Sequence, residues 1–423
     1  MQLLLAGISN FIQVFLVFTG FFYLFISLAG LRPVARRPAR AGRLHRFAVV
    51  MAAYNEEGII AYALDSLLRM DYPRELFDVF LAADHCTDRT VEIARSKGVS
   101  VFPHEGGLPR GKGFALKAVC DHIISLKRHD ALCFFDADSL AHPDFLRQMN
   151  AHVDRGECAV QAYEEPKNPD DNWLSRMAYV SQTIFNRLYQ YPKHVLGLSA
   201  TLHGKGMCFT PDIMRRFPWD GTCLTEDIEL QMRLIAAGVK VSFAPAAIVY
   251  DEEPTSFREH IHRSVRWAAG ALDTARRHLG PLWARAFRRR DVRAFEAAVR
   301  LTQTYRFAIL LALAGMIWLT HDSFHFLSWL FDRPYGAQLR YKLVHWSPLF
   351  FYPLVALLME RARPRYFLHY FLMPALSVMT GLPVFVLGVL KNRKREWYRT
   401  AHTSRVSIED IAVGKSSAPA AED

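Results

Sequence analysis

Short apolar runs alternate with helical stretches between residues 47 and 154. The runs predict strands at residues 47–53, 77–83, 99–102 and 131–135. The stretches between them predict helices near residues 57–69, 88–97, 112–126 and 143–154. Strand-helix alternation of this kind builds a mainly parallel α/β sheet with helices on both faces. Ligands bind such sheets beyond the carboxyl ends of the strands.

Polar residues follow three of these predicted strands. The strand ending at residue 135 is followed by Asp136 and Asp138, which share one face because they are one residue apart. Two carboxylates with water and phosphate oxygens suit Mg²⁺ or Mn²⁺. The alternative is an ordinary strand-to-loop corner, where Asp is common. Further polar residues follow the first two strands, among them Tyr54, Asn55, Glu56, Asp84 and Asp88.

A Gly-rich segment and an acidic helix start add two more candidates. In Arg110-Gly-Lys-Gly113, free amides at a helix start and Lys112 could meet phosphate. Thr225-Glu226-Asp227 opens a helix that ends at Gly238. Acids in the first turn of a helix also have a structural explanation, because their interaction with the helix dipole stabilises the helix by about 0.3–1 kcal/mol.

Long apolar segments flank this region. Residues 2–31 carry no charge, and a bilayer core needs only about 20 residues of helix. Residues 32–46 hold six Arg and no acid, which places that end on the cytoplasmic side. We expect two further spans at 305–320 and 343–359. The segment 366–390 contains two Pro between basic ends and is expected to form a kinked re-entrant or interfacial hairpin, with residues 404–423 disordered in the cytosol.

The formal net charge of +11 does not indicate nucleic acid, because the basic clusters flank hydrophobic segments and suit anionic lipid headgroups. The six Cys form no C-x-x-C pair and no zinc-like spacing with His. Reduced, cytosolic cysteines are therefore expected.

The ordered motifs resemble the membrane-bound family 2 glycosyltransferases, which include cellulose, hyaluronan, chitin and poly-N-acetylglucosamine synthases. The string runs from Tyr54-Asn-Glu-Glu through Ala83-Asp-His-Cys-Thr-Asp-Arg-Thr, Arg110-Gly-Lys-Gly and Asp136-Ala-Asp to Thr225-Glu-Asp. It ends in His262-Arg-Ser-Val-Arg-Trp267, where His replaces the family's Gln. That replacement weakens the inference of processive polymerisation. An amphipathic membrane-surface helix is the alternative for this last segment.

The resemblance implies a GT-A nucleotide-sugar-binding α/β domain and a role for each matching residue. Asp227 would be the catalytic base with Glu226 beside it, Asp138 would bind the metal with Asp136 nearby, and Trp267 would stack on the acceptor sugar. His203, in a Gly-rich stretch near the family's acceptor site, is an additional acceptor candidate, although a lone His is more often structural. The donor would be held by Tyr54, Glu56, Asp84, Lys112, Asp136, Arg263 and Arg266.

We therefore predict six parts: a transmembrane helix (1–31), a basic linker (32–46), a cytosolic GT-A domain with interfacial helices (47–270), a basic membrane-proximal segment (271–302), a transmembrane or re-entrant region (303–390) and a cytosolic tail (391–423).

The predicted enzyme is a multi-pass inner-membrane, inverting hexosyl- or N-acetylhexosaminyltransferase dependent on Mg²⁺ or Mn²⁺. It would use a UDP-sugar and a lipid or growing glycan acceptor. Polymer export would require an accessory subunit. The alternatives are a nucleotidyltransferase, a non-catalytic nucleotide-sugar-binding membrane protein, and a nucleic-acid-binding protein, whose binding would depend steeply on salt.

Overall fold

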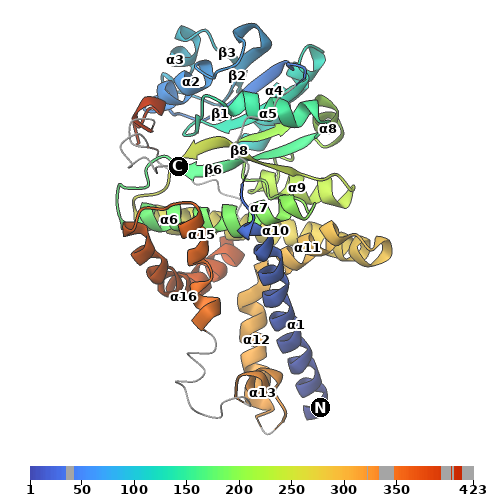
Figure 1. Cartoon of the computed structure of the whole chain (residues 1–423). Helices are drawn as coiled ribbons and strands as arrows, with labels where there is room; N and C mark the ends of the chain where they lie inside the picture. Colours follow the sequence, from blue (N-terminus) through green and yellow to red (C-terminus); the bar gives the residue numbers. More distant parts are fainter. Residues whose placement is uncertain (35–41, 322, 333–346, 392–401, 403, 412–423) are drawn as a thin grey trace.

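The computed structural model describes residues 1–34, 42–321, 323–332, 347–391, 402 and 404–411. An α/β domain lies above a layer of helices, and two long helices project from the far side of that layer (Figure 1). The prediction of an α/β domain joined to apolar helices is confirmed.

One mixed sheet of eight strands forms the centre of the domain, in the order β3-β2-β1-β4-β7-β6-β8-β5. The predicted strands form its parallel half, because β1 pairs in parallel with β2 and β4, and β2 with β3. In the other half β6 and β8 are parallel, whereas β7 and β5 are antiparallel to their neighbours. The strands are β1 (Phe47–Ala53), β2 (Phe77–Asp84), β3 (Ser100–His104), β4 (Ala131–Asp136), β5 (Leu140–Ala141), β6 (Ala159–Pro166), β7 (Met207–Phe209) and β8 (Ser242–Asp251).

Helices cover both faces of the sheet because its strands are apolar on both sides. Along β1, Val49 and Met51 join the core cluster beneath α2 and α5, whereas Ala48 and Val50 join the cluster beneath α4 and α9. This is the alternation expected of an extended strand. The covering elements are α2 (Ile60–Leu68), η2 (Arg74–Leu76), α3 (Thr90–Ser96), α4 (Lys112–Ser125), α5 (Phe145–Asp154), α8 (Pro211–Arg216) and α9 (Glu226–Ala236).

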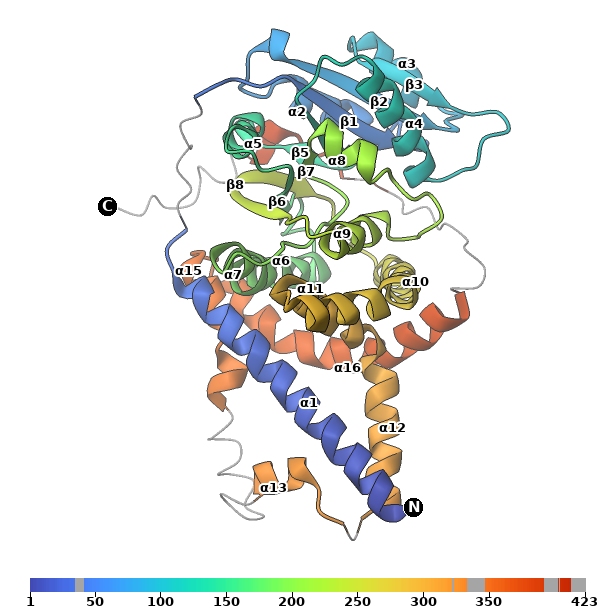
Figure 2. The same ribbon diagram turned by 90° about the vertical axis from the view of Figure 1, so that its right-hand side faces the viewer.

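A helical layer separates the α/β domain from the projecting helices (Figure 2). It contains α6 (Trp173–Phe185), a π-helical turn (Asn186–Gln190), α7 (Tyr191–Val195), α10 (Phe257–Arg289) and α11 (Val292–Thr302). A buried ion pair joins α7 to α11, with Lys193 Nζ 3.0 Å from Glu296 Oε2. Tyr189 of the π-helical turn donates a 2.8 Å hydrogen bond to the same carboxylate. Such buried charges are tolerated because they are paired and hydrogen-bonded.

Within the described residues, three helical segments are long and apolar enough to cross a membrane: Gln2–Leu31, Val292–Leu319 and Arg365–Lys391. The first contains α1 (Gln2–Leu28) and η1 (Ala29–Leu31), and the second contains α11, η4 (Gln303–Tyr305) and α12 (Arg306–Leu319). In the second, α11 lies in the helical layer and packs against α10, and α12 projects beside α1 (Figure 2). The predicted spans at 2–31 and 305–320 thus coincide with apolar helices.

Two predictions for the C-terminal region are wrong, and a third is tested only in part. The expected span at 343–359 coincides from residue 347 onward with an apolar helical segment, Ser347–Met359, which contains α15 (Leu354–Met359). Residues 343–346 lie outside the described residues, so the full span stays a prediction. The predicted hairpin is one helix, α16 (Arg365–Lys391), with both Pro inside it. It runs crosswise to α12 beneath α10 (Figure 2). Neighbouring helices can accommodate Pro in an apolar helix, so Pro did not mark a turn.

The second wrong prediction is disorder from residue 404 onward. Residues 404–411 lie against the α/β domain, where Ile408 and Ile411 pack on the core cluster of β1 and β2. Arg69 of α2 forms an ion pair with Glu409. Apolar and charged contacts to the domain therefore order a segment whose composition is polar. Residues 412–423, where the prediction also applied, lie outside the described part of the chain.

Candidate active site

A cavity at the carboxyl ends of β1, β2, β4 and β8 is lined by all of the predicted site residues. They come from four strand ends or loops and three helices, and α4 and α9 both begin at the cavity. The residues are Tyr54, Glu56, Asp84, Lys112, Asp136, Asp138, His203, Glu226, Asp227, Arg263, Arg266 and Trp267. The structure therefore brings the whole predicted set together, while the role of each residue stays a prediction.

The donor-side corner is organised by Asp84 at the end of β2. Asp84 Oδ2 accepts a 2.9 Å hydrogen bond from the amide of Gly111, and its Oδ1 lies 2.8 Å from His85 Nδ1. Gly111 has a φ of 140°, a conformation that side-chain-bearing residues rarely adopt, and it caps α4. The strand end and the glycine turn thereby fix where α4 starts and where Lys112 enters the cavity.

Lys112 lies between the two groups of acids. Its Nζ is 2.5 Å from Asp136 Oδ1 and 3.3 Å from Glu226 Oε1, and it donates a 3.2 Å hydrogen bond to the Gly204 carbonyl. Burial acts to lower the pKa of Lys112, but the carboxylates of Asp136 and Glu226 outweigh it and raise that pKa above its usual value. The ammonium group is therefore a fixed positive charge that can meet a diphosphate.

Asp227, in the first turn of α9, has a carboxyl group suited to proton transfer. Burial, and then the nearby Glu226 carboxylate, raise the pKa of Asp227 to about 6. Its Oδ1 accepts a 2.8 Å hydrogen bond from the Ile228 amide. A carboxylate with a pKa near the working pH can act as a general base. Glu226 differs because it is already paired with Lys112.

A close helix contact brings the Arg-Trp pair to the same cavity. Gly270 of α10 lies so near the start of α9 that a Cβ there would come within 2.4 Å of Thr225 Cγ2. The contact places Arg266 and Trp267 beside the acids of α9. Arg263 lies 4.5 Å above the Trp267 ring as a cation–π partner, which restrains this half-exposed indole.

The two carboxylates that follow β4 are in different surroundings. Asp136 is paired with Lys112, whereas Asp138 is buried and lies 3.1 Å (Oδ2) from His402 Nδ1. Burial, and then the Asp251 carboxylate, raise the pKa of Asp138 above its usual value. A bound divalent cation would relieve this crowding of negative charge. The donor set at Asp138 therefore fits Mg²⁺ or Mn²⁺.

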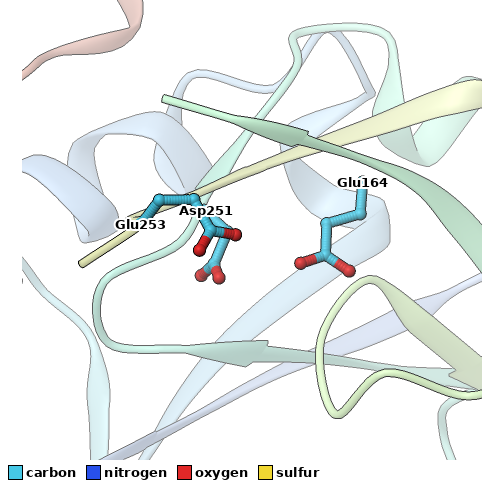
Figure 3. Close-up of side chains that lie close together, drawn as sticks. All are labelled: Glu164, Asp251 and Glu253. Carbon is cyan, nitrogen blue, oxygen red and sulfur yellow. The ribbon is translucent and has the colours of Figure 1, made fainter. Parts of the chain in front are cut away.

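A second group of acids meets the distance requirement for a metal site. Glu164, Asp251 and Glu253 each offer an oxygen, and the three oxygens lie within 4.8 Å of one another (Figure 3). Two cations already balance this group. Lys205 pairs with Glu164 at 3.1 Å and also with Asp251, and Arg263 pairs with Asp251 at 3.4 Å and Glu253 at 3.2 Å. The cluster could hold a metal by geometry, but its charge is largely neutralised.

Three residues of the cavity with titratable side chains are absent from the predicted set: Lys205, Asp251 and His402. Asp251 ends β8, and the apolar run 242–250 followed by Asp-Glu-Glu is the same strand-end signal that identified Asp136. Lys205 lies in the Gly-rich stretch beside His203, whose Nδ1 is 2.7 Å from Glu164 Oε2. His402 has no comparable local signal.

Comparison with known proteins identifies the family. A family model described as "Glycosyltransferase like family 2" matches residues 45–270, more than half of the chain. The chain belongs to glycosyltransferase family 2. Among solved structures, this chain is similar to the mannosyltransferase PcManGT from Pyrobaculum calidifontis in complex with GDP-Man and Mn²⁺. The TM-score is 0.57 at 16% sequence identity, and the match covers 93% of this chain and 100% of that one. This likeness shows the shared GT-A fold.

Two bacterial proteins are similar to this chain in sequence. "Probable glycosyltransferase YdaM" of Bacillus subtilis is 25% identical over 238 residues, covering 54% of this chain and 55% of its own length. The beta-monoglucosyldiacylglycerol synthase of Nostoc is 27% identical over 240 residues, covering 54% of this chain and 49% of its own. The match thus spans about half the length of these relatives.

Proposed function

We propose that the protein is a metal-dependent, inverting family 2 glycosyltransferase that moves a hexose or N-acetylhexosamine from a UDP-sugar to a lipid-borne acceptor at the cytoplasmic face of the inner membrane. The observation that carries the proposal is the cavity itself. It holds a half-buried carboxyl group with a pKa of about 6 beside a fixed Lys charge and an Arg-Trp pair. A nucleotidyltransferase would not need Asp227 or the Arg-Trp pair.

The chemistry divides among the residues by position. Tyr54, Glu56 and Asp84 would hold the base and ribose, and Lys112 would face the diphosphate. Asp138 would hold the divalent cation, whose charge would neutralise that of the departing diphosphate. Asp227 would take the proton of the acceptor hydroxyl, and attack from the face opposite the nucleotide inverts the anomeric centre. Arg266 would pair with the diphosphate, and Trp267 would stack on the acceptor sugar.

The proposal of a lipid acceptor rests on an apolar cavity of about 680 Å³ on the membrane side of the helical layer. Its walls come mainly from α1, α6, the π-helical turn, the segment 347–359 and α16. Of these, α1 and α16 belong to candidate membrane spans. Phe185 lines this cavity, and its ring lies 5.1 Å from that of His203, which lines the catalytic cavity. A lipid chain lying in the apolar cavity would therefore present its headgroup near Asp227. The similarity to a monoglucosyldiacylglycerol synthase supports the same acceptor class.

The proposed reaction can be tested with the purified full chain in lipid nanodiscs. Labelled UDP- and GDP-sugars would be supplied with Mn²⁺ and either diacylglycerol or a soluble oligosaccharide, and the products would be sized. We expect release of UDP coupled to one discrete glycolipid. A ladder of oligomers would show a polymerising synthase instead, and release of pyrophosphate would show a nucleotidyltransferase. Binding of the donor without any turnover would contradict the proposal.

The raised pKa of Asp227 predicts the pH dependence of this reaction. A base must be deprotonated, so kcat/KM should fall about tenfold per pH unit as the pH decreases below about 6. It should approach a plateau above that value. The measurement is kcat/KM between pH 4.5 and 8.5 at saturating Mn²⁺, with the folded state checked by circular dichroism at each pH. A profile that stays flat down to pH 4.5 would argue against Asp227 as the base.

A further inference from the structure

A further cavity, with a volume of about 190 Å³, lies between β6 and α6. Its lining is mainly polar, and no Lys or Arg of the described residues contributes to it. The polar groups come from Glu164 and Glu165 of β6, Tyr179, Gln182 and Thr183 of α6, and Glu360 after α15. We call it the polar cavity, and none of these residues has a role in the reaction described above.

Two carboxylates of the polar cavity are fixed by buried ion pairs. Glu164 Oε1 lies 3.1 Å from Lys205 Nζ, and Glu360 Oε1 lies 3.1 Å from Arg187 Nη1. The charge of each carboxylate is therefore balanced, but a carboxylate has about four acceptor positions and can still accept from a ligand. An anion would have no proton to donate to these oxygens, whereas the hydroxyl groups of a neutral ligand can donate to them.

Gln182 adds a hydrogen-bond donor to the same lining. Its Nε2 is buried and has no hydrogen-bond partner among the described residues. Most buried polar groups in proteins are paired, so an unpaired amide in a cavity wall points to a ligand or a water molecule as its partner. A sugar hydroxyl satisfies both demands of the lining, because it can accept from Gln182 and donate to a carboxylate. The polar cavity thus has the chemistry of a carbohydrate-binding site.

Helix α6 separates the polar cavity from the apolar cavity to which the lipid was assigned. It lies between β6 and α16 (Figure 2). Gln182 and Thr183 line the polar cavity, whereas Ile184 and Phe185 line the apolar one. Residues two positions apart point to nearly opposite sides of a helix, so α6 presents a polar flank to one cavity and an apolar flank to the other.

Three residues in contact join these two cavities to the catalytic one. Phe185 lines the apolar cavity, His203 the catalytic cavity and Glu164 the polar cavity. The Phe185 ring lies 5.1 Å from that of His203, and His203 Nδ1 lies 2.7 Å from Glu164 Oε2. A molecule whose apolar tail and reacting hydroxyl occupy the first two cavities therefore has the polar cavity beside its headgroup.

We propose that the polar cavity binds a sugar unit of the acceptor, so that the enzyme extends a glycolipid instead of glycosylating a simple diacylglycerol. The inference rests on the proposed function, because it assumes that Asp227 activates the attacking hydroxyl. The terminal sugar would carry that hydroxyl at Trp267, and the preceding sugar would lie in the polar cavity. A cavity of about 150 Å³ holds a benzene ring, so about 190 Å³ suits a six-membered sugar ring.

This assignment places the reaction after an earlier glycosyl transfer, which must supply the sugar-bearing lipid. The alternative is that the polar cavity holds only water and that the acceptor ends within the catalytic cavity. The two alternatives differ in acceptor preference. A sugar subsite favours diglucosyldiacylglycerol over diacylglycerol, whereas a hydrated cavity gives no such preference.

The preference can be measured with the full chain in nanodiscs that contain either lipid as the acceptor, at a fixed concentration of donor. We expect kcat/KM to be at least tenfold higher for diglucosyldiacylglycerol than for diacylglycerol. Gln182→Leu should lower the value for the glycolipid about three- to tenfold, the usual effect of losing one hydrogen bond, and leave that for diacylglycerol unchanged.

Gln182→Leu also separates binding from a structural role. Replacing an unpaired buried amide by an apolar side chain of similar size does not destabilise a fold, so a structural role predicts no loss for either acceptor. Gln303→Leu is the matched control, because Gln303 is half-buried in η4 and lines none of the three cavities. It should keep the acceptor preference of the wild type.

Native mass spectrometry tests the subsite without turnover. Chain released from nanodiscs with equal amounts of the two lipids, and without donor, should retain more diglucosyldiacylglycerol than diacylglycerol, and Gln182→Leu should reduce that excess. Equal retention and equal kcat/KM for the two lipids, or a preference that Gln182→Leu leaves unchanged, would overturn the assignment. The proposed function fails separately, if the wild type retains the glycolipid but transfers no sugar to it from any nucleotide-sugar.

Discussion

Asp227→Asn is expected to lower kcat by about 10²–10⁴, the usual range for loss of a general base. The amide cannot accept the acceptor's proton but has nearly the same size and keeps an oxygen for the Ile228 amide. Binding of UDP-sugar, measured by calorimetry with Mn²⁺ present, should therefore change less than threefold. A loss confined to kcat would place Asp227 at the chemical step.

Two substitutions serve as comparisons for Asp227→Asn. Glu226→Gln removes the neighbouring carboxylate that pairs with Lys112, so its effect should fall mainly on donor affinity. Asp212→Asn changes an exposed acid of α8 that lies outside the cavity, and it should leave turnover unchanged. Equal kcat losses for Asp227→Asn and Glu226→Gln would show that neither acid alone is the base.

Removal of the divalent cation is expected to abolish turnover. Excess chelator should reduce the rate at least a hundredfold, and Mn²⁺ should restore it, because the ion contributes several kcal/mol by neutralising charge on the leaving diphosphate. Asp138→Asn should reproduce the loss even when Mn²⁺ is present at millimolar concentration. The measurement is the initial rate of UDP release in both conditions.

The cluster of Glu164, Asp251 and Glu253 is the alternative metal site, and a further variant distinguishes it from Asp138. If the ion were held by Glu164, Asp251 and Glu253, Glu253→Gln would weaken Mn²⁺ binding as strongly as Asp138→Asn does. We expect it to change Mn²⁺ affinity less than threefold, since Arg263 already pairs with Glu253 at 3.2 Å. A loss for Glu253→Gln matching that for Asp138→Asn would move the metal site to the cluster of Figure 3.

The parallel half of the sheet and most of the cavity could be predicted because strand ends leave a local signal. An apolar run followed at once by acids marks Asp84 and Asp136, and both lie at the predicted edge. The same signal was present at Asp251, where β8 ends, but no strand had been predicted there. Without that strand, the ion pairs that Asp251 forms with Lys205 and Arg263 could not be predicted.

Other features depend on contacts between distant parts of the chain and leave little trace in the sequence. Pro374 and Pro383 suggested a turn, yet α16 continues through both and packs beneath α10. The polar segment 404–411 looked disordered, but Ile408 and Ile411 dock on the core. His402 reaches Asp138 only because that segment is fastened to the domain. In each case, contacts between distant parts of the chain determine the structure.

The anomeric configuration of the transferred sugar tests the central claim most directly. Single displacement with Asp227 as the base requires that an α-linked UDP-sugar yields a β-linked product. The one-bond and three-bond couplings of the anomeric proton in the purified glycolipid, measured by nuclear magnetic resonance, distinguish the two anomers. We predict a β-linked product from the wild type; an α-linked product would contradict single displacement and the role assigned to Asp227.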